Sequence, residues 1–196
     1  MSARLTAIPF TKDDLDAVAD FHCGDNPWAE YVAEWIKGAP GGVLVALDIG
    51  TDIWLYLNDD NEIVGYGSLG TSEWNYPDPY KTAPGGKKVC LNMIPAFAVQ
   101  SQFHGQPPGH WSQHYSSEIL NDLIAEATRR CVQDPSLAPL LGLFVDERNA
   151  RAIRHYENHG FKKYAKPIKG RGQRMLLLLP VASINQGMSQ DSRSDG

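Results

Sequence analysis

Two kinds of side chain in this sequence could act as metal ligands or nucleophiles. Three histidines, His104, His110 and His114, lie within one loop-like stretch that also contains prolines and glycines. They are six and four residues apart and have no other type of metal ligand nearby, so the sequence predicts no metal site. The three cysteines, at positions 23, 90 and 131, are widely separated. This spacing indicates buried thiols in a reducing compartment.

The sequence also contains a strongly basic segment. Between Arg148 and Arg174 there are nine Lys or Arg residues and one acid, Glu157, so this segment carries +8. The whole chain has a formal net charge of −5, which leaves −13 on the remainder. Such asymmetry predicts an anionic partner near the basic segment. For any single lysine, an ordinary solvated position is the alternative.

The basic segment begins inside a strand-turn-helix-strand pattern. Residues 140–145 form a short apolar run that is typical of a buried strand, and polar residues that suit a helix start follow it. Ala150, Ile153 and Tyr156 then recur every three residues, which places them near one helical face. Gly160 stands where a helix commonly ends, and Phe161 leads into the next extended run.

Within this pattern, the spacing of five residues resembles the motif N-x-x-A-x-x-x-Y-x-x-x-G-F of the GNAT superfamily of N-acetyltransferases. The matching residues are Asn149, Ala152, Tyr156, Gly160 and Phe161. An ordinary capped helix is the alternative reading of the same residues. The resemblance implies an α/β (α+β) fold with a mixed, splayed central sheet flanked by helices, similar to the acyl-CoA N-acyltransferases. It also implies that acetyl-CoA enters between two parallel strands, here Val89–Val99 and Leu140–Val145.

The family's cofactor loop, R/Q-x-x-G-x-G/A, binds pyrophosphate through backbone amides at a helix start. This chain departs from that pattern. Aligned on His104, the motif has Pro107 and Gly109 at the glycine positions, and proline offers no amide. A second alignment keeps residues 103–106, inserts about seven residues and resumes at His114. The cofactor-binding residues that the resemblance implies are Ala98, Val99, His104, Gly105, Gln106, Tyr115, Ser116, Asn149 and Tyr156.

Transfer of an acetyl group to an amine requires the loss of a proton from nitrogen and the delivery of one to the leaving thiolate. By resemblance, Tyr156 is the catalytic acid, since a phenol can protonate sulfur. The general base is less clear because no carboxylate lies between Leu91 and Val99. Glu73 is our candidate by position, with Asp146, Glu147 and ordered water as alternatives.

Aromatic residues gather in the two regions that flank the acceptor side of the resembled fold. Trp28 lies in an amphipathic stretch to Ile36, and Trp74 and Tyr76 lie in a segment rich in proline and glycine. Carboxylates are interspersed among these three aromatic residues, and aromatic faces attract cations. We therefore expect a cationic amine to bind at Trp28, Trp74 and Tyr76. For Trp35, core packing is the better interpretation.

Length and composition predict one domain over residues 1–180, with a disordered tail at 181–196. Neither a secretory signal nor a membrane span is evident, so we expect a cytoplasmic protein. The sequence leaves open whether the protein forms a homodimer. The leading hypothesis is an acetyl-CoA-dependent N-acetyltransferase, without a metal, that acts on a small-molecule or protein amine.

Two alternatives remain at this point. The segment FHCGDNPWAEYV resembles the F-x-C-G segment of toxin-type acetyltransferases that modify aminoacyl-tRNA, although the chain as a whole is acidic. A catalytically inactive, acetyl-CoA-binding regulatory protein is the other alternative, because prolines alter the cofactor loop.

The same patterns predict the remaining elements. We expect a helix after Thr11, a helix over Trp28–Ile36 and an extended segment over Val43–Leu47. A hairpin should join Asp52–Leu57 to Glu62–Leu69, with Gly65 and Gly67 marking a close backbone approach. Glu73–Lys88 is expected to be a loop. The other expected elements are a central strand interrupted at Pro95, a helix over Tyr115–Val132 and a last strand over Met175–Leu179.

Overall fold

The computed structural model describes residues 5–76, 87–105, 115–165 and 174–181. A mixed sheet of eight strands runs through the molecule in the order β1-β2-β3-β4-β6-β8-β7, and β5 pairs with β3. The strands are β1 (Thr6–Pro9), β2 (Asp52–Leu57), β3 (Ile63–Tyr76), β4 (Lys87–Ile94), β5 (Phe97–Val99), β6 (Leu137–Asp146), β7 (Lys162–Ala165) and β8 (Arg174–Pro180). The helices are α1 (Pro27–Ile36), α2 (Val43–Asp48), α3 (Tyr115–Gln133) and α4 (Ala150–Asn158).

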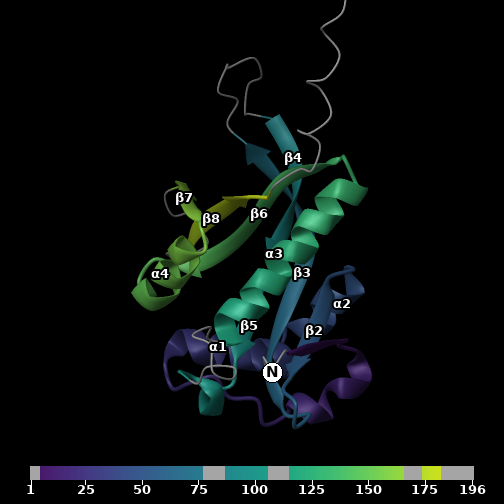
Figure 1. Ribbon diagram of the computed structural model, residues 1–196, viewed down its shortest axis with the longest axis vertical. Helices are drawn as coiled ribbons and strands as arrows, with labels where there is room; N and C mark the ends of the chain where they lie inside the picture. Colours follow the sequence, from purple (N-terminus) through teal and green to yellow (C-terminus); the bar gives the residue numbers. More distant parts are fainter. Residues whose placement is uncertain (1–4, 77–86, 106–114, 166–173, 182–196) are drawn as a thin grey trace, which may run out of the picture.

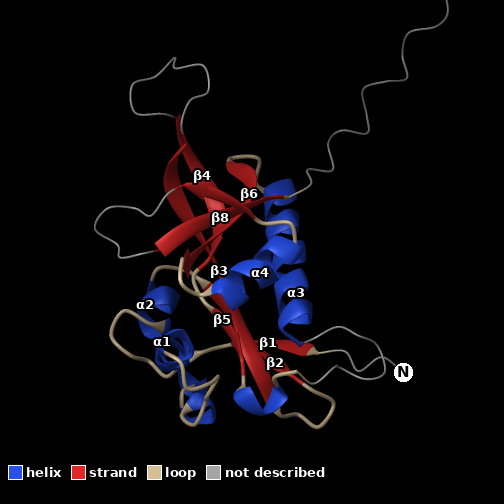
Figure 2. Cartoon of the chain, turned by 90° about the vertical axis from the view of Figure 1, so that its left-hand side faces the viewer, coloured by secondary structure: helices blue, strands red, loops and turns tan. Residues whose placement is uncertain are grey.

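Helices cover both faces of this sheet (Figures 1 and 2). On one face, α3 packs on β3 and β6 over a cluster that includes Ile119, Leu123 and Leu141. On the other face, α1 and α2 pack over Phe21, Leu55 and Tyr66. None of the described helices is long and apolar enough to cross a membrane. The predicted α/β architecture with a mixed sheet is confirmed.

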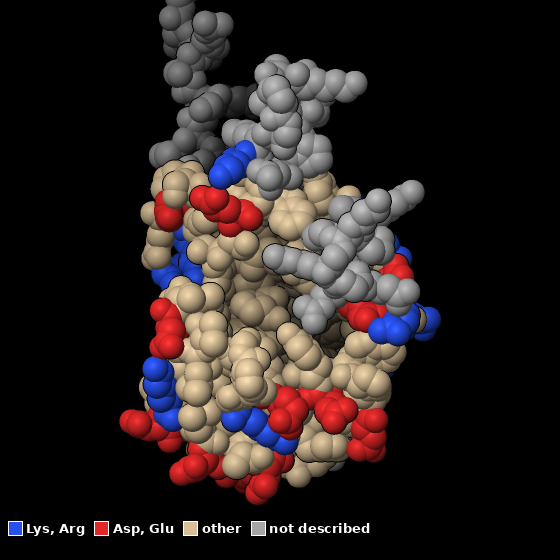
Figure 3. All heavy atoms as spheres, turned by 180° about the vertical axis from the view of Figure 1, so that it is seen from behind, with Lys and Arg blue, Asp and Glu red and all other residues tan. Residues whose placement is uncertain are grey.

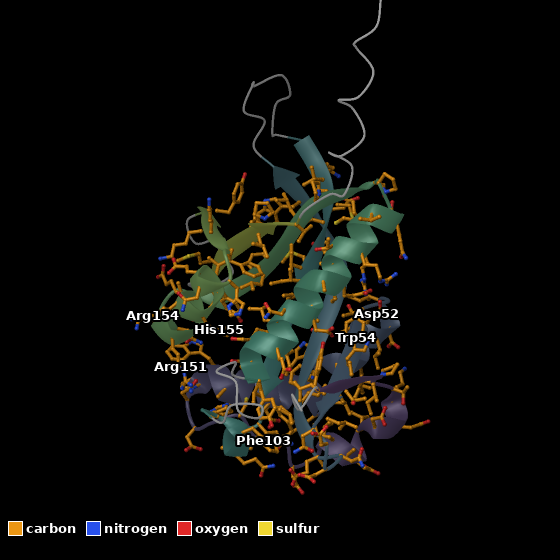
Figure 4. All side chains as sticks on the ribbon, viewed as in Figure 1. Asp52, Trp54, Phe103, Arg151, Arg154 and His155 are labelled. Carbon is orange, nitrogen blue, oxygen red and sulfur yellow. The ribbon has the colours of Figure 1, made fainter. Side chains whose placement is uncertain are left out.

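Ionic contacts attach the C-terminal half of α3 to the edge of the sheet. Arg130 pairs with Asp52 on β2 and, at 3.1 Å, with Glu126 one turn earlier in α3. Its guanidinium lies 6.0 Å from the centre of the Trp54 ring (Figure 4). These contacts hold the C-terminal half of α3 against β2.

Three local predictions were wrong. Residues 43–47 belong to α2 and are not extended. The segment after Thr11 forms two short 3₁₀ turns, 12–14 and 16–18, in place of an α-helix. Strand β3 also continues to Tyr76 and β4 begins at Lys87, so only the middle of the predicted loop 73–88 remains outside the strands. That middle part lies outside the described residues.

The central strand is interrupted at Pro95, as predicted. β4 pairs with both β3 and β6 and ends at Ile94, whereas β5, which begins at Phe97, pairs with β3. β4 pairs in parallel with β6 up to Ile94 and Leu143, whereas β5 pairs antiparallel with β3. The sheet therefore divides after Leu143: β5 stays with β3, and the end of β6 stays with β8.

Candidate active site

The site is the opening between β5 and the last residues of β6. Pro95 has no amide hydrogen and cannot continue the ladder, which explains why the pairing stops at this point. Gly65 on β3 allows β5 to lie close, because a Cβ at Gly65 would be 2.3 Å from the Ala98 carbonyl oxygen. The predicted close backbone approach at Gly65 is thereby explained.

The pairing of β5 determines which backbone groups face the opening. The Gln100 amide donates to the Val64 carbonyl at 2.8 Å, and antiparallel pairs alternate in hydrogen bonding. Ala98, opposite Tyr66, therefore directs its amide and carbonyl toward β3. Phe97 and Val99 direct theirs the other way, toward β6. The Val99 carbonyl lies 2.9 Å from His104 Nε2, so the exposed His104 side chain folds back onto β5.

Tyr156 lies on α4 beside this opening. Its ring contacts Phe97 of β5 and Phe161 edge-on, with centroid separations of 5.9 and 5.8 Å. Burial raises the pKa of the Tyr156 phenol well above its usual value, so the group is protonated at neutral pH. The protonated phenol is held between two aromatic rings beside the opening, and its raised pKa makes it a weaker acid than a free tyrosine.

The turn from β6 into α4 is fixed by two capping side chains. Asn149 accepts a hydrogen bond from the Ala152 amide at 3.1 Å, which makes it the N-cap of α4. Asp146 accepts from the Arg148 amide at 2.9 Å and from two guanidinium nitrogens at 3.0 and 2.9 Å. The Arg148 side chain, and then its backbone amide, hold the pKa of Asp146 well below its usual range. Such a strong acid is a poor general base near pH 7.

Asp146 also connects α4 to α1. The Trp28 indole, in the first turn of α1, contributes a further hydrogen bond that lowers the pKa of Asp146. Trp28 is half-buried, and its helix begins at the N-cap Asn26, whose side chain accepts from two amides. The predicted acceptor residue Trp28 therefore stands at the end of β6, close to the opening.

Glu73 is not brought to the opening. It lies opposite Cys90, four residues before the strands separate, and its side chain is 73% exposed with Lys88 3.6 Å away. Its neighbour Trp74 points to the other face and contacts Phe144, with ring centroids 5.9 Å apart. Tyr76 ends β3, and nothing of its side chain is described. Trp35 stacks on Tyr66 in the core, as expected.

The predicted cofactor loop is only partly described. His104 and the left-handed Gly105 (φ 74°) end a 3₁₀ turn, and Gln106, His110 and His114 lie outside the described residues. Tyr115 and Ser116 are the first two residues of α3, where orphan amides favour an anion. The Tyr115 ring meets Phe103 edge-on at 5.8 Å.

Two residues beside Tyr156 were missed by the sequence analysis. Phe97 packs against Tyr156, and its backbone faces the opening, while His155 contacts both rings at 6.4 and 5.9 Å. Figure 4 shows His155 on the side of α4 nearer α3 and Arg154 on the outer side, and Arg151, one turn before His155, lies close to the same helical face as His155. Phe97 follows the strand-breaking Pro95 by two residues, and that spacing was the signal that could have identified it.

No family model matches this sequence, and no curated protein matches it. Solved structures are similar over almost the whole chain. AtaTR bound with acetyl-CoA has 18% identity and a TM-score of 0.63, with 92% of this chain and 95% of that chain covered. AtaT complexed with acetyl-methionyl-tRNAfMet has 17% identity and a TM-score of 0.59, with 90% and 94% covered.

The NatC complex bound to Gag peptide and CoA is a third similar structure. It has 14% identity and a TM-score of 0.54, with 91% of this chain and 99% of that chain covered. At these identities the similarity concerns the fold. Together with the divided sheet and the position of α4, it establishes that this chain has the fold of the GNAT superfamily of N-acetyltransferases.

Proposed function

We propose that this protein is an acetyl-CoA-dependent N-acetyltransferase that transfers an acetyl group to a primary amine in a ternary complex. The observation that carries the proposal is the position of Tyr156, a protonated phenol beside the gap between β5 and β6. The similar structures that contain acetyl-CoA or CoA support it.

Several groups of this chain suit acetyl-CoA. The backbone of Phe97 and the amide of Val99 face the opening and are suited to the amide groups of pantetheine. The start of α3, at Tyr115 and Ser116, favours phosphate through its free amides and its dipole. Bound acetyl-CoA supplies the reactive thioester. Asn149 serves first as a helix cap, and we expect it to order the adjacent part of the site.

Tyr156 accounts for the proton that the leaving group needs. The acceptor nitrogen forms a bond to the acetyl carbon while the carbon–sulfur bond breaks, and Tyr156 gives its proton to the thiolate. The phenol regains that proton from solvent. The amine must also lose a proton, since a group with a pKa near 10.4 is only about 0.04% neutral at pH 7. Asp146 is too acidic for that step and Glu73 is distant, so ordered water is the proposed acceptor.

The direct test is thiol release from acetyl-CoA in the presence of a panel of primary amines. We expect amine-dependent release from the wild type, and Tyr156→Phe should lower kcat by about 10²–10⁴-fold with little change in the KM for acetyl-CoA. A Tyr156→Phe variant with unchanged kcat across the pH range would remove the acid assignment. Binding of acetyl-CoA without transfer to any amine would favour the regulatory alternative.

A second candidate substrate is the amino group of an aminoacyl-tRNA. Arg151 and Arg154 are exposed on α4, and neither has an ion pair within the described ranges (Figure 4). Such free cations suit phosphate, and the similar AtaT structure contains acetyl-methionyl-tRNAfMet. The F-x-C-G segment gives less support, because Phe21 packs on Tyr66 and the Cys23 thiol donates to the Ala29 carbonyl.

Filter binding of tRNA across a range of salt concentrations tests this candidate. If it is correct, Arg151→Glu with Arg154→Glu should weaken binding and reduce the salt slope by about two. Arg129→Glu on α3 is the control, because Arg129 is held by Glu126 away from α4. Absence of tRNA binding by the wild type at low salt would eliminate this substrate.

A further inference from the structure

One face of the sheet carries an apolar cluster outside the two helix-covered cores. Alternate residues of β4 determine the two faces: Asn92 is directed at Cys131 of α3, so Leu91 and Met93 are directed to the opposite face. The neighbouring strands add apolar residues to that same face, and Asp146 is next to it at the end of β6. The buried members are Leu91, Met93, Leu176 and Leu178, and the partly buried ones are Trp74, Val89, Ala138, Leu140, Phe144 and Tyr164.

Aliphatic side chains pack over the centre of this cluster, and aromatic rings lie at its edge. Trp74 and Phe144 begin on β3 and β6, with β4 between them, yet their ring centroids are only 5.9 Å apart. Gly142 lies beneath, where a Cβ would be 2.6 Å from Met93 Sδ and 3.1 Å from Leu178. A glycine is needed at this position because the long side chains of both neighbouring strands converge over it.

This apolar face is continuous with the proposed acceptor opening. Phe144 directly follows Leu143, the last residue of β6 that pairs with β4, so its half-buried ring stands where the sheet divides. Asp146 lies two residues further on the same face and reaches Trp28 of α1. The face seen in Figure 3, from behind Figure 1, is hollowed near its centre, and residues other than Lys, Arg, Asp and Glu line the hollow.

The carboxylate at the end of β6 does not make this surface attractive to a highly charged acceptor. Asp146 already accepts three hydrogen bonds from Arg148, so its charge is matched within the chain. An acceptor on this side therefore meets two aromatic rings and aliphatic side chains, with no unmatched carboxylate from β6 at their edge.

We propose that the acceptor is a monoamine that carries an aromatic group, and that this group packs against Phe144 and Trp74. The inference rests on the proposed transferase function and specifies its substrate class. Burial of an aromatic group at such a surface corresponds to a preference of about 10- to 100-fold over a small polar amine. Phe144 is thus the residue that determines specificity.

The test compares kcat/KM for phenethylamine, ethanolamine and spermidine at pH 8, together with calorimetric binding of acetyl-CoA. For the wild type we expect phenethylamine to exceed the other two by at least 10-fold. Phe144→Ala should reduce that ratio to about one. Phe144→Leu retains an apolar side chain, so it separates the loss of the ring from a failure to fold. This variant should lose at least half of the preference for phenethylamine. Ile49→Ala, which removes an exposed apolar side chain outside this cluster, is the control.

The inference alone would be overturned if kcat/KM for ethanolamine or spermidine equalled or exceeded that for phenethylamine. A preference for phenethylamine that both Phe144 variants retain would also overturn it. The same holds if acetyl-CoA binds and phenethylamine is not acetylated. If acetyl-CoA does not bind, the proposed function fails as well, and the calorimetry identifies that case.

Discussion

At the scale of single residues, Asp146 has a role that its position in the sequence does not reveal. It stands between a buried strand and a helix, where a carboxylate could act as a general base or as a cap. The three hydrogen bonds from Arg148 and the contact with Trp28 identify it as a positioning residue that connects β6, α4 and α1. The lowered pKa follows from those donors, and it removes Asp146 from the possible bases.

Asp146→Asn should therefore change the stability of the fold. The pH dependence of catalysis should not change, because Asp146 is not the proposed base. Because folding lowers the pKa of Asp146, the ionised carboxylate contributes stability above its unfolded pKa, near 3.9, and this contribution is lost as the pH falls through the lower folded pKa. The Tm difference between wild type and variant should be largest at pH 5–8 and should shrink as the pH falls below about 4. Scanning calorimetry at several pH values measures this.

The kinetic counterpart is the pH profile of kcat/KM. We expect Asp146→Asn to keep the acidic limb of that profile, because another group accepts the amine proton. Glu147→Gln, on the exposed neighbour, is the matched control. Loss of the acidic limb in the Asp146 variant alone would show that Asp146 is the base after all.

At the scale of elements, the close pairing of β5 with β3 is what keeps the sheet divided. Gly65→Ala would place a methyl group 2.3 Å from the Ala98 carbonyl oxygen and 3.2 Å from the Val99 Cα, both of which are backbone atoms. We expect a loss of about 1–3 kcal/mol in the free energy of unfolding, as for other overpacked interiors, and a lower kcat because β5 must move. Urea denaturation and thiol-release assays measure the two effects.

Gly67→Ala is the control for this substitution. Its added Cβ meets side-chain atoms of Leu123 and Tyr56 at 3.1–3.2 Å, and side chains can adjust where backbone cannot. The smaller loss of stability should therefore occur at Gly67. A larger loss at Gly67 than at Gly65 would mean that the β3–β5 contact is not the tighter constraint.

Most elements could be predicted from the sequence because their periodicity was strong. Pro95 marked the interruption of the central strand, and Gly160 marked the end of α4. α2 was not recognised, since Val43–Leu47 is continuously apolar, and such a run does not distinguish a strand from a short buried helix. Its N-cap, Gly42, lies against the Trp35 carbonyl, where a Cβ would be only 2.5 Å from the oxygen, and no local pattern shows this contact.

The candidate site was less predictable because it depends on contacts between distant segments. The motif from Asn149 to Phe161 placed Tyr156 on a helix, and the structure places that helix beside Phe97. Glu73 could be suggested only from its place in the expected order of strands and loops. Its pairing with Cys90 places it within the β3–β4 ladder and not at the opening. The ion pair between Asp146 and Arg148 joins residues that are only two apart in the sequence. Helix-capping patterns alone did not predict this pair.

At the scale of the whole molecule, the division of one sheet into two diverging parts brings together groups from almost the entire chain. In the proposed site, β5 supplies backbone groups, α3 a helix start and α4 the phenol, while α1 and β6 form the proposed acceptor side. Formal charge is also uneven along the chain: the segment from Arg148 to Arg174 is basic, although the chain carries −5 overall.

Binding of acetyl-CoA should stabilise this whole arrangement, because its parts meet only in the folded state. At a free concentration 100-fold above Kd, a ligand that binds only the native state adds about 2.7 kcal/mol to the free energy of unfolding. For a chain of 196 residues, this corresponds to a rise in Tm of about 5–11 °C. Tyr156→Phe should show the same rise if the hydroxyl has the proposed role in proton transfer and contributes little to binding. Scanning fluorimetry with acetyl-CoA, and with acetate as the control ligand, measures the shift. A rise no larger than that with acetate would mean that the gap between β5 and β6 does not bind acetyl-CoA.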